Sequence, residues 1–383
     1  MKNDTIIIGG GASALMLASL LPKKSVTLIE TNAKLGAKIA VSGGGKCNIT
    51  NEKVDASYYL ADASFVTPSL KAFNQKSLLR WLERQGLEPV LRKKHQYFCE
   101  HSSNELLDIF KKESKKQHIV LQANVERVEK KEGLFYVYTS KGSYQAKRLV
   151  VASGGLSFPA LGASAIGYEV AQSFGHSIKK TTPALVGFTV QKEQFFFKTL
   201  SGTSTEVTMK VGEKSCSGAL LFAHKGLSGP AVLDASLYWE KGKVEIDFLP
   251  EFSWKSIAGS KKHISSLLPM PKRVTKAFLE AFEIEDAPYH TLTKAEYDKL
   301  QTLSCYTFSP AGTFGYSKAE VTKGGVATNE VDAVTMMSKK EEGLYFLGEV
   351  LDVTGQLGGY NFQWAFSSAY SCAKEIKGKI NEK

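Results

Sequence analysis

The stretch DTIIIGGGASALMLASLL, residues 4–21, decides the fold. Its first half, Thr5–Ile8, is a short run of β-branched apolar residues, which is typical of a buried parallel strand. Three glycines follow, and Ala12–Leu21 then carries apolar residues at helical spacing. Ser25–Ile29 predicts a second buried strand, which Glu30 ends. The sequence therefore predicts a βαβ unit in an α/β domain of the Rossmann type, with a parallel sheet.

The glycines of this unit match the dinucleotide fingerprint as Gly9-x-Gly11-x-x-Ala14. Gly9 would make the tight turn, Gly11 would let the backbone approach a pyrophosphate, and Ala14 would keep the helix close to the sheet. The helix begins at Ala12 and offers free N–H groups to phosphates. Glu30 is placed to accept hydrogen bonds from ribose hydroxyls, and a glycine turn in some other α/β fold would leave it unexplained. We therefore predict adenine-dinucleotide binding.

The composition is that of an ordinary globular protein. The chain has 383 residues, 43% hydrophobic and 23% charged, which is enough for two or three domains. Its net charge of +11 would suit an anionic ligand or a nucleic acid. The lysines are spread along the chain, however, and form no block of about five or six like charges. A nucleic-acid partner is therefore not expected.

The cysteines and the N-terminal residues indicate in which cell compartment the protein is expected. Five cysteines without a CxxC pair argue against a disulfide framework and a zinc site, so no metal is expected. An apolar strand begins within a few residues of Met1, which leaves no room for a signal peptide. No apolar run reaches the roughly 18 residues of a membrane span. We expect a cytoplasmic protein with no membrane partner.

Two later features favour FAD over NAD. The glycine run at 43–45 follows the βαβ unit directly and would suit a ligand that extends past the first helix, as the flavin half of FAD does. Residues 119–155 predict short strands with hairpin turns at Glu132-Gly133 and Lys141-Gly142. Such a three-strand meander, returning to a buried strand that ends near Gly154, is typical of flavoproteins with two dinucleotide folds.

The C-terminal region is the third such feature. Leu344–Leu347 predicts a buried strand, after which Gly358 and Gly359 open a helix with apolar residues every three or four positions. The N-terminus of that helix could face the flavin and stabilise the negative charge of its reduced form. The fingerprint does not occur a second time, so we expect no separate NAD(P)H domain.

Specific motifs carry a family resemblance. They are IIIGGGASALMLA, LGAKIAVSGGGKCNITN, VVASGGLSFPALGASAIGYEVAQSFGH, HKGLSGPAVLDAS and the C-terminal AEVTKGGVATNEVDAVTMMSKKEEGLYFLGEVLDVTGQLGGYNFQWAFSSAY. In these the chain resembles the HI0933-like (YhiN/BaiN-like) family of FAD-dependent oxidoreductases. The resemblance implies an FAD-binding domain interrupted by an insertion. The FAD-binding domain is expected to comprise residues 1–186 and 310–383, and the insertion to comprise a β-rich domain, residues 187–252, and a small helical domain, residues 253–309.

The resemblance also implies cofactor contacts beyond the fingerprint and Gly154. The residues expected at the FAD phosphates and flavin edge are Lys38, Ser42, Gly43, Gly44, Lys46 and Asn48. Val125 would contact the adenine through its backbone. The residues expected at the ribityl chain and ring are Gly348, Glu349, Asp352, Gly358, Gly359, Tyr360 and Asn361. The family commonly has Arg at Lys46, and often Asp at Ile166 and Pro at Cys99.

The middle of the chain predicts a β-rich insertion with a small helical cap. Strands are expected at Ala184–Gln191, Thr205–Val211, Gly218–His224 and Lys243–Leu249. Helices are expected from near Ser228, with Pro230 in the first turn, and at Trp254–Leu268, Lys272–Phe282 and Lys294–Leu303. His224 is the candidate catalytic residue, as proton donor or substrate contact, and a structural histidine is the alternative.

These observations predict an FAD-dependent oxidoreductase that transfers hydride between flavin N5 and a small organic substrate. Reduction of a C=C bond next to a carbonyl and oxidation of a small amine both stay open, with NAD(P)H or dioxygen as the second reactant. One alternative of another class is a flavoprotein that acts on tRNA, to which the net charge gives some support. Another is a flavin-binding protein without turnover. The oligomeric state stays open.

Overall fold

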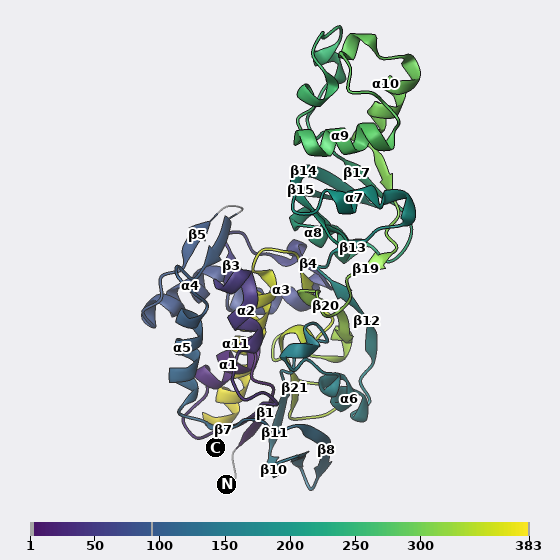
Figure 1. Ribbon diagram of the computed structural model, residues 1–383. Coiled ribbons are helices and arrows are strands. Elements are labelled where there is room, and N and C mark those ends of the chain that lie inside the picture. Colours follow the sequence, from purple (N-terminus) through teal and green to yellow (C-terminus); the bar gives the residue numbers. More distant parts are fainter. Residues whose placement is uncertain (1–3, 93–94, 382–383) are drawn as a thin grey trace. The chain divides into compact units, whose positions relative to one another are not determined.

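The computed structural model describes residues 4–92 and 95–381. The chain forms two compact units, which Figure 1 shows with their elements labelled. Unit 1 comprises residues 1–182 and 321–383, and unit 2 comprises residues 183–320. The finer subdivision expected at 186/187, 252/253 and 309/310 stays a prediction.

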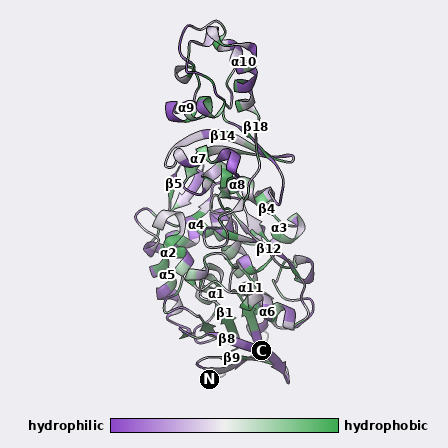
Figure 2. Cartoon of the chain, turned by 45° about the vertical axis from the view of Figure 1, so that its right-hand side comes forward, coloured by the Kyte–Doolittle hydropathy of each residue, from purple (hydrophilic) through white to green (hydrophobic). Residues whose placement is uncertain are grey.

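A five-stranded parallel sheet forms the centre of unit 1. Its strands, in the order β21-β11-β1-β2-β7, are Leu344–Phe346, Arg148–Val151, Thr5–Ile8, Val26–Ile29 and His118–Val120. All four neighbouring pairs run parallel. Strands β1, β2, β11 and β21 are buried along their whole length, as expected for strands covered on both faces, and Figure 2 shows apolar residues at β1. The predicted Rossmann-type parallel sheet, including the return of the chain at β21, is confirmed.

Helix α1 (Ala12–Leu20), which packs on β2, also packs against α11 (Tyr360–Asn381). Residues Ser13–Ser19 of α1 are all buried, and Trp364 and Phe366 of α11 are no more than 1% exposed. A helix that is apolar on every side belongs inside a protein. The remaining helices of unit 1 are α2 (Ala37–Gly45), α3 (Ala63–Ala72), α4 (Gln75–Arg84), α5 (Asn104–Ser114) and α6 (Ile166–Ser173).

Unit 1 also contains two three-stranded sheets and two short strand pairs. The predicted meander is confirmed as β8 (Val125–Lys131), β9 (Leu134–Thr139) and β10 (Gly142–Ala146), with antiparallel pairing throughout. The second sheet has the order β3-β6-β5, with strands Asn48–Asn51, Gln96–Phe98 and Val90–Arg92. Short pairs are β4 (Tyr59–Leu60) with β22 (Thr354–Gly355), and β12 (Ile178–Ala184) with β20 (Val321–Val326).

Unit 2 has its own sheet and its own aromatic core. The strands, in the order β18-β17-β14-β15-β16-β13-β19, are Tyr306–Phe308, Val244–Asp247, Ser204–Val211, Lys214–Ala223, Gly226–Ser228, Phe188–Thr189 and Gly312–Thr313. The helices are α7 (Phe196–Thr199), α8 (Pro230–Tyr238), α9 (Lys272–Ala281) and α10 (Lys294–Gln301). Phe197, Phe222, Phe248, Phe278 and Phe308 are buried together in the core.

Two expectations for the insertion are wrong. Trp254–Leu268 is not one helix but two short 3-10 turns, Trp254–Ile257 and Ile264–Ser266, because Gly259 between them has φ +72°. The strand expected at Ala184–Gln191 is broken by Leu185, whose φ is +50°. Apolar spacing did not reveal these left-handed residues.

Candidate functional site

The first glycine turn, Gly9–Gly11, joins β1 to α1. Gly9 has φ +107°, and a side chain there would overlap the carbonyl oxygen of Ala152. A Cβ on Gly11, by contrast, would meet no atom within 4 Å. No side chain caps α1, and its first turn holds no acidic residue. The leading N–H groups of α1 are therefore available to an anion, and the residues present fit a dinucleotide pyrophosphate.

Glu30 supports this turn from the end of β2. Its Oε2 accepts a hydrogen bond from Gly10 N at 2.6 Å. Its Oε1 accepts bonds from the backbone N and the side-chain Nδ2 of Asn32, at 2.7 and 2.8 Å. The carboxylate thus fixes the glycine turn, a role that sequence reasoning did not foresee. Its contact with a ribose stays a prediction.

The second glycine run breaks α2 before its end. Gly43, Gly44 and Gly45 have φ of +56°, +64° and +83°, a series of left-handed residues that only glycine adopts readily. A Cβ on Gly44 or Gly45 would meet no atom within 4 Å, whereas one on Gly43 would lie 2.9 Å from Asn48 N. Gly44 and Gly45 therefore present bare backbone, as close approach by a ligand requires, whereas Gly43 packs against the protein. Lys46 follows the run, half-buried, and Ser42 Oγ donates to Ile39 O.

Glu349 connects three segments that lie far apart in the sequence. Its Oε2 lies 2.7 Å from Lys38 Nζ, and its Oε1 accepts a hydrogen bond from Thr322 N at 2.9 Å. A Cβ on Gly154 would lie 3.7 Å from Glu349 Oε2. The structure therefore brings the predicted residues Lys38, Gly154 and Glu349 together. Sequence reasoning assigned no role to Thr322, although it lies in the motif AEVTKGG; its Oγ1 also accepts a hydrogen bond from Leu156 N.

The third glycine turn, Gly358–Gly359, begins α11. Both residues have positive φ, +136° and +92°. A Cβ on Gly359 would lie 2.7 Å from the carbonyl group of Thr50 and 2.8 Å from Asn48 Oδ1. Asn51 Nδ2 donates to Gly358 O at 3.1 Å. The turn therefore sits directly against β3, beside the predicted residue Asn48.

The side chains of Tyr360 and Asn361 are held by the protein. The Tyr360 ring stacks on Tyr58 at 4.6 Å between centroids, and the Tyr360 residue is 5% exposed. Asn361 Oδ1 accepts from Gly355 N, and its Nδ2 donates to Gly355 O, at 2.8 and 2.9 Å. These contacts order the start of α11. Contact of either residue with a flavin ring stays a prediction.

The other predicted residues are spread around the sheet. Gly348 has φ +68°, and its carbonyl accepts from Trp364 Nε1 at 3.1 Å. Asp352 is half-buried, and burial raises the pKa of its carboxyl group. Val125 opens β8 and pairs with Thr139, and Ala12 and Ala14 lie in the first turn of α1.

His224 belongs to a different unit of the chain from these residues. It is exposed in the turn between β15 and β16, in unit 2, whereas every predicted cofactor residue belongs to unit 1. Its catalytic role stays a prediction. In residues 4–92 and 95–381 no group of three or more His, Cys, Asp or Glu side chains could hold a metal ion. No helix in this same portion of the chain is long and apolar enough to cross a membrane.

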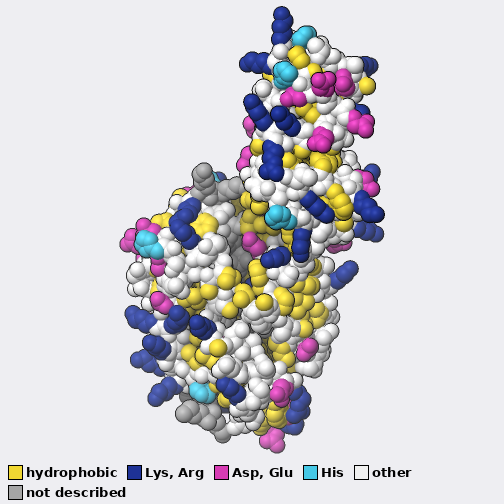
Figure 3. Space-filling model, viewed as in Figure 1, with side chains coloured by type: hydrophobic (Ala, Val, Ile, Leu, Met, Phe, Trp, Pro, Cys, Tyr) yellow, Lys and Arg dark blue, Asp and Glu magenta, His cyan; other side chains and the backbone are white. Residues whose placement is uncertain are grey.

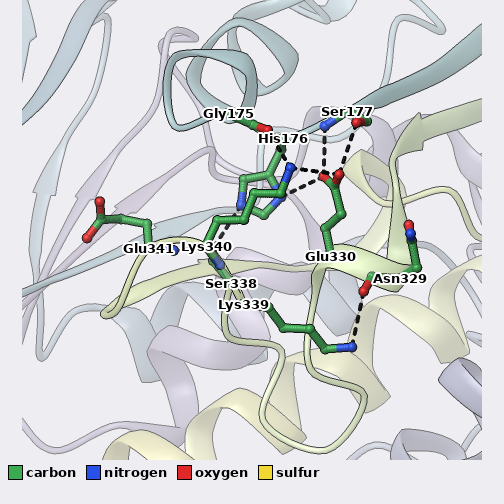
Figure 4. Close-up of polar contacts among 9 residues, drawn as sticks. All are labelled: Gly175, His176, Ser177, Asn329, Glu330, Ser338, Lys339, Lys340 and Glu341. Carbon is green, nitrogen blue, oxygen red and sulfur yellow. Dashed lines mark hydrogen bonds and ion pairs between the residues drawn. The ribbon is translucent and has the colours of Figure 1, made fainter.

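A buried polar cluster around His176 lies in unit 1 (Figure 4). His176 Nε2 lies 2.7 Å from Ser338 Oγ, and its Nδ1 lies 3.3 Å from Glu330 Oε2. Ser338 Oγ also accepts hydrogen bonds from the N–H groups of Lys340 and Glu341. Because both lone pairs of the hydroxyl are thereby used, its proton goes to Nε2, and the ring proton is on Nδ1, towards Glu330. Ser338 is 3% exposed and His176 is 4% exposed, so these two side chains are closed to a substrate.

We expect this cluster to make stability depend on pH. Burial lowers the pKa of His176 from 6.5, although the nearby Glu330 carboxylate opposes this shift. Burial would raise the pKa of Glu330, but hydrogen bonds from Lys340 and Ser177 outweigh it and lower that pKa to about 2. The unfolded state therefore binds more protons, and the free energy of unfolding should fall as pH drops below about 6.5, by at most about 1.4 kcal/mol per pH unit per proton. Glu330 adds a further loss between about pH 4.5 and 2.

Urea unfolding over a pH series tests this expectation. His176→Gln can still bond to Ser338 but cannot titrate, so its stability should vary less between about pH 5 and 7 than that of the wild type. Equal pH dependence in the two proteins would assign the titration to another group.

Comparison with known proteins assigns the chain to a family. The family model described as HI0933-like protein Rossmann domain matches residues 3–375. A protein of Haemophilus influenzae named ribosomal RNA dihydrouridine synthase is 38% identical and covers 98% of both chains. Its namesake in Escherichia coli is 37% identical over 97% of this chain and 98% of its own.

A third relative has a different substrate in its name. The 3-dehydro-bile acid delta(4,6)-reductase of Clostridium scindens is 31% identical over 95% of this chain and 96% of its own. The matching family model and the three full-length relatives show that the chain is a flavin-dependent oxidoreductase that belongs to the HI0933-like family of Rossmann-domain proteins.

Proposed function

We propose that this protein reduces the C5=C6 double bond of a uridine in ribosomal RNA to give dihydrouridine, with FAD as its cofactor. The observation that carries the proposal is the near-complete match to two relatives named ribosomal RNA dihydrouridine synthase. The bare backbone at the glycine turns beginning at Gly9 and Gly43, together with Glu30 beside the first of them, supports a dinucleotide as the flavin.

The names of the relatives point to one kind of bond. The C5=C6 bond of uracil is conjugated with the C4 carbonyl, and the Δ4,6 double bonds of a 3-dehydro bile acid are conjugated with the C3 carbonyl. Both substrates are therefore activated alkenes, as in the enone-type reduction expected from the sequence. When bound, the reduced flavin would supply a hydride to the β carbon of such a bond. The oxidation of a small amine gains no support from these relatives.

The protein's own residues would bind and orient the cofactor. The N–H groups at the start of α1 and the bare backbone of 44–45 would bind the pyrophosphate, and Lys46 would add a positive charge. Glu349 pairs with Lys38 and accepts a hydrogen bond from Thr322 N, contacts that would keep α2 and β20 in place when the cofactor binds. A group that delivers a proton to the α carbon is also needed, and His224 stays the candidate.

The distribution of charge favours a polyanionic substrate. The sequence of unit 1 has 33 Lys and Arg against 23 Asp and Glu, whereas unit 2 has 16 against 15. The excess positive charge therefore belongs almost entirely to the unit that carries the dinucleotide motifs. Basic side chains are spread over the face of the molecule seen in Figure 3. Such charge favours RNA, and the proposal departs here from the expectation that nucleic acid is not a partner.

Nucleoside analysis of ribosomal RNA tests the proposed function. RNA from a strain that lacks the gene should have lost dihydrouridine, and a plasmid copy of the gene should restore it. The purified holoprotein with NADH or NADPH should form dihydrouridine in RNA from the deletion strain. Bleaching of the flavin under anaerobic conditions would identify the nucleotide donor. Unchanged dihydrouridine in the deletion strain, or reduction of a steroid enone but not of RNA, would overturn the proposal.

We expect His224→Gln to lower turnover on RNA about 100-fold and to leave the flavin content unchanged, because a proton donor typically contributes a factor of at least about 100. Single-turnover rates across a pH series measure the effect. A merely structural histidine would instead change the melting temperature and leave the rate within a few fold of wild type. His290→Gln is a matched control, since His290 is also an exposed histidine of unit 2.

A further inference from the structure

One face of the β3-β6-β5 sheet lies beside the second glycine run. In the register of β5 and β6, Val90 is opposite Phe98 and Arg92 is opposite Gln96, so these four side chains share a face. The Phe98 Cε1 atom lies 3.0 Å from the position of a Cβ on Gly43, which places the ring against the glycine run. This aromatic side chain is only partly buried and does not belong to the main core.

Arg92 and Gln96 extend the same face. The Arg92 guanidinium carbon lies 5.5 Å from the centre of the Phe98 ring, and Nη2 donates to Glu100 O at 3.2 Å. Arg92 is exposed, and no carboxylate among the described residues pairs with it. Gln96 Oε1 accepts from Asn48 Nδ2 at 2.8 Å and so connects the face to the strand that follows the glycine run. An aromatic ring and a cation without a carboxylate partner in the described part of the chain therefore lie together beside the glycine run at which the flavin is predicted.

We propose that Phe98 and Arg92 form a platform that receives an unpaired uridine of RNA, Phe98 by contact with the base and Arg92 by binding a neighbouring phosphate. The inference rests on the proposed function and names its recognition surface. A base must leave its stack before an enzyme can reach its ring atoms, and an aromatic side chain replaces some of the lost stacking. A guanidinium without a carboxylate partner is suited to a phosphate oxygen pair.

Two features of the chain favour this occupant over a neutral small molecule. The platform lies in unit 1, whose sequence carries the positive excess of the protein. Leu91 also lies on β5 and is 49% exposed, so the strand offers apolar surface to a partner on its other face as well. RNA proteins combine a positive surface with stacking side chains in this way.

Binding of a short fluorescein-labelled oligouridylate to the holoprotein, followed by anisotropy at several salt concentrations, tests the platform. Phe98→Leu should weaken binding about tenfold without changing the salt dependence, because it removes stacking but no charge. Phe98→Tyr should retain the affinity. Arg92→Gln should weaken binding and reduce the slope of log K against log salt by about 0.7, the contribution of one phosphate contact on a single strand. Arg84→Gln, which removes an exposed arginine of α4, should match the wild type.

The outcomes separate this inference from the proposed function. Equal affinity of Phe98→Leu and wild type would overturn the platform, whatever the wild type does to ribosomal RNA. Loss of flavin from Phe98→Leu would assign the ring to the cofactor and also overturn it. Failure of the wild-type gene to restore dihydrouridine would overturn the proposed function instead. Weaker binding by Phe98→Leu and Arg92→Gln, with flavin retained and with less dihydrouridine restored in the deletion strain, supports the platform.

Discussion

Replacement of Gly11 by valine is expected to give a folded protein that purifies without flavin. A Cβ at this position meets no atom within 4 Å, so the protein itself has room for the new side chain. The position precedes α1, however, whose leading N–H groups have no side-chain cap and are available to an anion. A branched side chain would occupy the space of the pyrophosphate. We therefore expect loss of binding with little loss of stability.

Visible absorbance relative to protein absorbance measures retained flavin, and thermal melting of the apoprotein checks the fold. Gly378→Val is the matched control, because a Cβ on Gly378 also meets no atom within 4 Å and Gly378 lies on the exposed side of α11. That variant should stay as yellow as the wild type. A fully yellow Gly11→Val protein would show that the first glycine turn is not the phosphate site, and the dinucleotide assignment would fail.

Short-range patterns in the sequence were sufficient for the nucleotide-binding half of the fold. The β1-α1-β2 unit, the meander and β21 all have apolar runs or hairpin glycines that act over a few residues, and the structure confirms them. The three glycine turns could be found for the same reason, since a glycine at positive φ marks a bend wherever it occurs.

Contacts between segments that are distant in the sequence could not be predicted from short-range patterns. Thr322 donates its N–H to Glu349, and its Oγ1 accepts hydrogen bonds from Leu156 N and Ser157 N. The last two contacts join residues more than a hundred positions apart, and a single threonine contributes no periodic pattern. The pairing of β3 with β6 is of the same kind. It brings Phe98 to Gly43, although β6 is only three residues long and no alternating pattern distinguishes it. The proposed substrate platform is therefore less visible in the sequence than the glycine turns.

Gly359→Ala should destabilise the protein by about 3 kcal/mol and also weaken flavin binding. A Cβ on Gly359 would lie 2.7 Å from the carbonyl carbon and oxygen of Thr50, and these backbone atoms of β3 cannot rotate away. The residue also has φ +92°, which an alanine adopts only with strain. Overpacking of about 1–3 kcal/mol and backbone strain of about 1–3 kcal/mol act together here. Urea unfolding of the apoprotein and titration with FAD measure the two effects.

Gly133→Ala separates the two causes. Gly133 has φ +76° in the turn between β8 and β9, and a Cβ there meets no atom within 4 Å, so this variant carries the backbone strain alone, about 1 kcal/mol. The further loss in Gly359→Ala would then measure the close packing of the α11 start against β3. Because Asn48 Oδ1 lies 2.8 Å from the same Cβ position, a shift there displaces a predicted flavin contact, whereas Gly133→Ala should bind FAD normally. Equal stability of the two variants would mean that α11 can move away from β3 at no cost.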